Sequence, residues 1–277
     1  MTSRFQKASL LLAMLLAVSI GRVAFADATL EYRGPQNARL SFLFAPGRMR
    51  VDVTIEHLSG SILYDEAARK MWIVDHARRS YVEVGEDLLR QIREVRRQME
   101  SRLSQLPPAV REQMERMLTP PGFVRISVPQ DLCESPKVIG TETIRGLVAK
   151  VVDGCRSLVG GEWVTCRGWF VDGSALGLDL KDLRVLESFL AFYLEFLRTV
   201  GLPEFLGDSH LLLTQPRPPK TLDLGLTFPV PVKGAAVKDG REFHTVFLEK
   251  VSTGPLPGAV FTAPKGYTEI KIRLPQI

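Results

Sequence analysis

The stretch ILYDEAARKMWIVDHARRSY, residues 62–81, contains nearly the same pattern twice. The pattern Asp-x-Ala-x-Arg starts at Asp65 and again at Asp75, and each copy follows an apolar triplet. As chemistry, the two aspartates would form a paired carboxylate site. As architecture, they are turn formers, because an aspartate side chain accepts hydrogen bonds from the backbone that follows it. We favour the second interpretation, which predicts two successive hairpin connections of the same kind.

Alternating apolar residues beside this repeat predict an antiparallel meander. Side chains with a period of two fall on one face of a strand. Turn-like residues recur about every 8–12 residues, which is the spacing of hairpin-connected strands. The inner face of the predicted sheet is expected to carry Phe42, Phe44, Met49, Val51 and Val53.

Residues 86–118 change character and predict a helical hairpin inserted into the sheet. Leu89, Ile92 and Met99 fall on one helical stripe, and Pro107-Pro108 ends the first helix. Arginines and acidic residues are mixed around the rest of the surface, which indicates a solvated face rather than a cationic patch. We therefore expect this arm to be peripheral.

Strand patterns return after the arm. Gly160-Gly161 is a strong signal for a two-residue hairpin turn. The strands expected in this part of the chain are 123–128, 141–152, 162–171, 224–232, 241–251 and 267–272.

The hairpin centred on Gly160-Gly161 also predicts a cysteine pairing. If Val159 faces Glu162, each step away from the turn pairs the preceding residue of the first strand with the following residue of the second. Four steps out, Cys155 faces Cys166. Facing residues on neighbouring strands lie within the distance that a disulfide needs. We therefore predict a disulfide, with two reduced core cysteines as the alternative. The third cysteine lies elsewhere, at position 133, and has no assigned partner.

Residues 180–200 predict a helix that is apolar around most of its circumference. Its aromatic residues include Phe189, Phe192, Tyr193 and Phe196. A surface helix needs an apolar stripe on only part of its circumference, so this helix is expected to be buried or to contact an apolar ligand. Its longest apolar run is too short to cross a bilayer, and we expect no membrane span.

The first 26 residues have the three parts of a secretory signal peptide. Arg4 and Lys7 precede an apolar core, and Ala24-Phe25-Ala26 has the small-x-small pattern of a cleavage site. The mature chain would begin at Asp27 and be periplasmic. The full chain has a net charge of +5, and loss of Arg4, Lys7 and Arg22 leaves 33 basic and 31 acidic residues, or +2. This near-neutral balance gives no reason to expect nucleic acid as a partner.

Motifs of known catalytic and metal sites are missing from the sequence. The four histidines do not have metal-ligand spacing. The sequence around Ser174 is not a nucleophile elbow, because Asp172 stands where the first glycine belongs. We therefore expect no metal, no cofactor and no catalytic residues.

The whole pattern resembles the periplasmic LolA/LolB-like superfamily, and within it an uncharacterised branch. The resemblance rests on GRMRVDV, ILYDEAARKMWIVD, RRSYVEV and GTETIRGL, and on a closing F-x-x-P-x-G-Y segment, here Phe261, Pro264, Gly266 and Tyr267. It implies an α+β fold, in which an incurved antiparallel sheet, or half-barrel, has its concave face covered or plugged by helices. Residues 27–277 would form a single domain of this kind, with the helical hairpin as an insertion.

Two functions are compatible with this resemblance, and a hydrolase with scattered catalytic residues is a third for which the sequence gives no positive evidence. The first is a non-enzymatic protein that binds an acyl chain, a lipid or a lipoprotein between sheet and helices, on the residues Phe42, Phe44, Met49, Val51, Phe189, Phe192, Tyr193 and Phe196. The alternative is an interaction or envelope-sensing module that binds a protein partner and no lipid. The two differ in whether the sheet completely buries the apolar surface of the helix at 180–200.

Overall fold

The computed structural model describes residues 27–56, 58–107, 110, 137–159, 162–200 and 223–272. Four expectations lie outside these residues: the signal peptide at 1–26, most of the second helix of the arm, the strand at 123–128, and any partner of Cys133.

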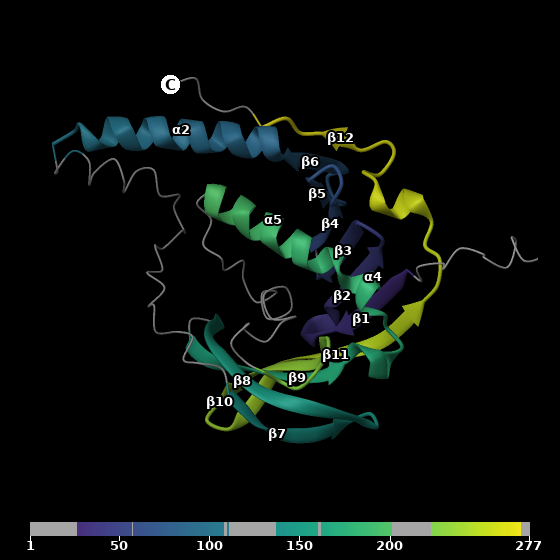
Figure 1. Cartoon of the computed structure of the whole chain (residues 1–277). Helices are drawn as coiled ribbons and strands as arrows, with labels where there is room; N and C mark the ends of the chain where they lie inside the picture. Colours follow the sequence, from purple (N-terminus) through teal and green to yellow (C-terminus); the bar gives the residue numbers. More distant parts are fainter. Residues whose placement is uncertain are drawn as a thin grey trace, which may run out of the picture.

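The described strands form one open sheet, which curves around a helix (Figure 1). The strand order is β12-β6-β5-β4-β3-β2-β1-β11-β10-β9-β8-β7, and neighbours are antiparallel except for the short parallel pair β12–β6. The expected α+β class with an open antiparallel sheet is confirmed. The strands are β1 (Ala28–Arg33), β2 (Arg39–Ala45), β3 (Arg48–Ile55), β4 (Leu58–Asp65), β5 (Lys70–Asp75), β6 (Ser80–Gly85), β7 (Lys137–Ile144), β8 (Leu147–Val159), β9 (Glu162–Asp172), β10 (Pro229–Lys238), β11 (Arg241–Thr253) and β12 (Thr268–Glu269).

The repeated Asp-x-Ala-x-Arg pattern is architecture, as predicted. Asp65 ends β4 and Asp75 ends β5, and each carboxylate accepts a backbone N–H bond of 2.9 Å from the residue three positions on. The arginine that closes each pattern has a left-handed backbone, with φ of 45° at Arg69 and 49° at Arg79. The two sequence copies therefore build two copies of one turn.

The prediction of a single strand at 141–152 is wrong. The chain reverses at Arg145-Gly146, so that Ile144 ends β7 and Leu147 begins β8. Both turn residues have positive φ, 50° and 83°, which is the requirement of the tight hairpin turn that favours glycine. The apolar residues on either side of this turn resemble one continuous strand.

The apolar helix lies inside the curve of the sheet (Figure 1). It is split into α4 (Leu180–Leu183) and α5 (Val185–Val200), with a break at Arg184. The arm begins with α2 (Glu86–Ser104), which contacts both β6 and α5. Leu89 in its first turn is fully buried in the main core, so the base of the arm is anchored while most of the helix is exposed. No helix in the described ranges is long and apolar enough to cross a membrane.

Asp172 joins the end of β9 to the segment that leads into β10. Its carboxylate accepts hydrogen bonds from the hydroxyl of Ser174 at 2.7 Å and its N–H at 3.0 Å, and from the N–H of Thr227 at 2.6 Å. The Ser174 hydroxyl contributes most to lowering the pKa of Asp172, which falls to about 2. The ionised form is thus favoured in the folded chain.

This pKa predicts a pH dependence. A carboxyl whose pKa is lower in the folded state stabilises the fold above its unfolded pKa of about 3.9 and loses that contribution as pH falls through the folded value. Asp172→Asn should therefore destabilise the protein at pH 7 by about 1 kcal/mol, the typical value of a helix cap. The difference in the free energy of unfolding between wild type and variant should become smaller from about pH 5 towards pH 2. Urea unfolding at a series of pH values measures it, and a gap that is constant with pH would contradict the assignment.

Candidate functional site

Aromatic side chains meet where α5 faces the sheet. We call Tyr64, Phe189, Phe192, Tyr193 and Phe196 the aromatic seam. The Tyr64 ring centroid lies 5.7 Å from that of Phe189 and 5.6 Å from that of Phe192. Phe189 stacks on Tyr193 at 5.7 Å. Each of these rings is almost completely buried.

The sheet side of this contact consists of the residues expected there. Phe42, Phe44, Met49 and Val51 are buried and belong to the same core cluster as the helix aromatics. Val53 packs against that cluster at its margin. The structure thus brings together all eight residues predicted to line a ligand site. Whether they bind a ligand stays a prediction.

The cavity enclosed at the start of α5 is small. A cavity of about 20 Å³ lies between β1, β2, α4 and the start of β10, lined by residues that include Phe44, Leu186 and Phe228. A cavity of this size holds about one water molecule. An acyl chain could enter this cavity only if α5 moved away from the sheet, whereas an open groove of about 620 Å³ lies along α5 beside Glu66 and Leu194.

Polar contacts also join α5 to its neighbours. The Tyr64 hydroxyl lies 2.8 Å from that of Ser188, and Glu195 pairs with Arg93 of α2 at 2.7 Å. Arg69 lies 3.8 Å from the same glutamate. Burial raises the pKa of Tyr64, against the opposing effect of its Ser188 hydrogen bond. The phenol therefore stays neutral at physiological pH, and the binding of α5 to the sheet depends mainly on apolar packing.

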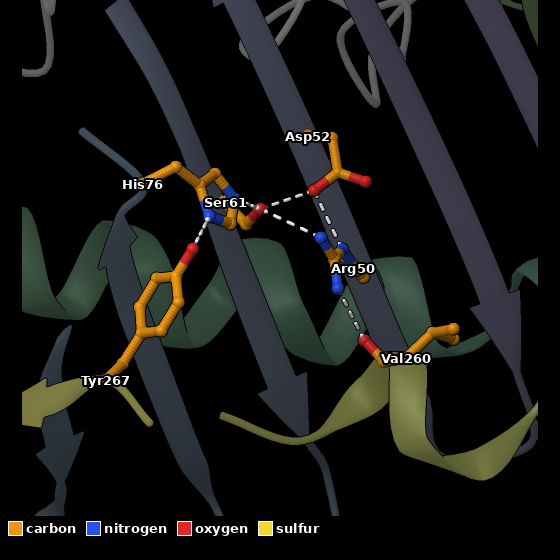
Figure 2. A network of polar contacts seen from close by, with 6 residues as sticks. All are labelled: Arg50, Asp52, Ser61, His76, Val260 and Tyr267. Carbon is orange, nitrogen blue, oxygen red and sulfur yellow. Dashed lines mark hydrogen bonds and ion pairs between the residues drawn. The ribbon is translucent and has the colours of Figure 1, made fainter. Parts of the chain in front are cut away.

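A polar network occupies the opposite face of the sheet (Figure 2). Ser61 on β4 is 3% exposed, and its oxygen lies 2.6 Å from Nε2 of His76. The same hydroxyl contacts the Asp52 carboxylate and accepts a bond of 3.2 Å from Arg50. Nδ1 of His76 lies 3.0 Å from the hydroxyl of Tyr267.

This serine–histidine pair does not have the geometry of a catalytic nucleophile. A hydroxyl has one hydrogen to donate and two lone pairs to accept with. The Ser61 hydroxyl donates its hydrogen to Asp52 and accepts from Arg50, so its contact with His76 requires the tautomer that carries the hydrogen on Nε2. In this arrangement no lone pair of the hydroxyl is left to attack a substrate, as a nucleophile must. The network is instead a half-buried cluster of mutually hydrogen-bonded groups around the buried Ser61, of the kind that orders its surroundings.

The network docks the C-terminal strap, residues 254–272, on the sheet. Arg50 donates to the carbonyl of Val260 at 3.0 Å, and Tyr267 contacts His76 as above. The N–H of Thr268 then donates to the carbonyl of Arg79, in the turn before β6, at 2.9 Å, and the N–H of Ile270 donates to that of Tyr81 on β6 at 2.8 Å. The F-x-x-P-x-G-Y segment is therefore the part of the chain that closes this face of the sheet.

A second polar cluster, not predicted from the sequence, lies on the β7–β11 half of the sheet. Trp169 on β9 is 1% exposed, and its indole N–H donates to Glu142 at 2.6 Å. The ammonium of Lys233 lies 3.8 Å from the centroid of the same indole. Glu242 pairs with this lysine at 2.7 Å. The buried indole on β9 thus links a carboxylate on β7 to a lysine on β10.

The predicted hairpin between β8 and β9 has the expected register next to its turn. Arg156 faces Thr165, and Val159 faces Glu162. Further out, the register shifts by one residue between Asp153 and Arg156. The two β8 residues within this shift, Gly154 and Cys155, therefore both lie opposite the buried Cys166 on β9. The disulfide stays a prediction.

Metal ligands do not gather in the part of the chain that the structure describes, where no group of three or more His, Cys, Asp or Glu could hold an ion.

Comparison with known proteins returns no matching family and no matching curated protein. Three solved structures share features of the fold. An uncharacterised conserved protein from Thermus thermophilus matches at 8% identity and a TM-score of 0.41, over 93% of this chain and 98% of that one. MucB in complex with MucA(peri) matches at 8% and 0.34, over 94% of this chain and 62% of that one. LprF from Mycobacterium bovis matches at 12% and 0.27, over 92% and 96%. Because these values are low, they indicate at most a distant likeness of fold and say nothing of what this chain binds.

Proposed function

We propose that this chain is an exported, non-enzymatic protein of the periplasm that binds an apolar ligand, such as an acyl chain, between α5 and the sheet. The observation that carries the proposal is the aromatic seam together with the sheet residues that it contacts. Sites for apolar ligands are concave and lined mainly by apolar and aromatic side chains. The curved sheet and α5 supply such a lining from residues far apart in the sequence.

Ligand binding in this site requires α5 to leave part of the sheet. The small cavity beside Phe44 and Leu186 is the point from which the contact opens. The side of α5 that faces the sheet is apolar, so a ligand there would replace the apolar contacts of α5 with apolar contacts of its own. An apolar ligand that fills the vacated surface offsets most of the cost of exposing it. The same surface would thus be covered by α5 in the free protein and by the ligand in the complex.

The proposal is tested with native mass spectrometry of the protein purified from a bacterial periplasm, followed by solvent extraction. We expect a mass above that of the polypeptide, and a lipid in the extract. A fluorescent fatty acid added to delipidated protein should show increased emission, with an association rate well below the diffusion limit because binding requires α5 to move first. If no lipid is extracted and no probe is taken up, the carrier function is wrong.

The alternative function is an interaction module with no lipid ligand. The observation in its favour is that the sheet buries most of the apolar surface of α5, leaving Leu190, Leu194 and Val200 only half-buried. In this case the helix is a permanent part of the core, and a protein partner binds elsewhere. The arm is one such surface, because α2 is exposed along most of its length. Failure of the lipid experiments would put this function first.

A further inference from the structure

The last strand of the sheet has an open edge. Among the residues that the structure describes, β7 pairs with β8 on one side only and is terminal in the strand order. Its residues from Lys137 to Thr143 are all exposed, including Val138 at 42% and Ile139 at 49%. An edge strand with unpaired N–H and C=O groups is a template for another strand. Apolar side chains exposed at such an edge favour coverage by a further chain.

A β-bulge places two opposite charges on the same face of this strand. Lys137 and Glu142 are five positions apart and would lie on opposite faces of a regular strand. The register of β7 against β8 shifts between Val138 and Gly140, so one extra residue is inserted at Ile139. Beyond the bulge, Glu142 faces Ala149, which is in the main core. Lys137 faces Asp153. Asp153 lies two residues along β8 from the core residue Val151, so Lys137 and Glu142 lie on the same face of the sheet, the one that carries the core.

This arrangement is complementary to itself. If two copies of β7 lie antiparallel about a two-fold axis between Ile139 and Gly140, Lys137 of each copy faces Glu142 of the other. Val138 of each copy then faces Thr141 of the other, on the face of the sheet opposite to that of the ion pairs. The bulged Ile139 faces Gly140, which has no side chain to crowd it and beside which an added Cβ would meet no atom of the described part of one chain within 4 Å. Opposite charges directly across a strand pair stabilise it, and like charges destabilise it.

We propose that β7 is a homodimer interface, in which two chains join edge to edge through antiparallel β7 strands and form two Lys137–Glu142 ion pairs. An isologous two-fold contact of this kind closes on itself and leaves no further free edge at that end of the sheet. The proposal is independent of the ligand-binding function, because β7 lies at the far end of the sheet from β3 and β4.

Sedimentation velocity of the purified protein over a range of concentrations tests the interface. We expect a reversible dimer that is weaker at high salt. Lys137→Glu should weaken dimerisation about tenfold or more, since both ion pairs become like-charge contacts. The double variant with Lys137→Glu and Glu142→Lys should restore it. Lys265→Glu, the same charge change on an exposed residue of the strap, is the matched control and should leave it unchanged.

Thermal melts of each variant check that the fold is intact, because Glu142 also accepts the indole bond of Trp169. A protein that is monomeric at every concentration would overturn the proposal and leave the edge to a strand of another protein. A dimer that Lys137→Glu does not weaken would also overturn it, since the contact would then lie elsewhere.

Discussion

Replacing Trp169 by alanine is expected to lower the free energy of unfolding by roughly 3–5 kcal/mol, which is the usual cost of removing a buried aromatic side chain. The indole fills the core between strands, and its loss also removes the ring under the Lys233 ammonium. That lysine has a side chain only 10% exposed and would depend on its ion pair with Glu242. The melting temperature should fall by roughly 6–20 °C for a chain of this size.

Trp72 provides a matched control for this variant. It also donates its indole N–H to a glutamate, Glu83, at 3.0 Å, but its side chain is only half-buried. Trp72→Ala should therefore cost about 1–2 kcal/mol. Chemical denaturation of both variants makes the comparison. Equal losses would show that the indole of Trp169 does not have the special role assigned to it.

Much of the first half of the fold could be predicted because its information is local. Turn chemistry at Asp65 and Asp75 and the alternation through Phe42 and Phe44 each depend on residues close in sequence. The hairpin register beside Glu162 followed from a single turn signal in the same way. The bulge further out could not be predicted, because an extra residue in a strand changes the pairing without altering the apolar pattern.

The polar clusters could not be predicted because they join distant parts of the chain. Arg50 and the carbonyl of Val260 are 210 positions apart, and His76 and Tyr267 are 191 apart. No spacing in the sequence marks such pairs. Tyr267 was singled out only as part of a closing segment, and its contact with the Ser61 hydroxyl through His76 depends on the strap crossing the sheet. Buried polar groups far apart in sequence are found only when the tertiary fold is known.

Phe192→Leu is expected to keep the fold and change ligand uptake, while Phe192→Asp is expected to unfold the protein or nearly so. The Phe192 ring is 2% exposed and lies 5.6 Å from Tyr64. Leucine is apolar and smaller, so the cost is about 1–2 kcal/mol. A carboxylate at this position would be buried, at a cost of several kcal/mol. The Arg69 guanidinium, 5.9 Å from the ring centroid, would offset part of it.

Phe261→Leu is the control that separates the site from general stability. This ring is also 2% exposed, and an arginine, Arg48, lies 5.7 Å from its centroid. It belongs to the strap on the opposite face of the sheet, away from α5. Both leucine variants should lose similar stability in thermal melts, but only Phe192→Leu should alter the affinity for a fluorescent fatty acid, by about threefold or more, since one or two methylene-sized contacts are worth about 1 kcal/mol. Equal effects on uptake would mean that the probe reports loosening of the fold. The lining of the site would then have to be sought away from α5.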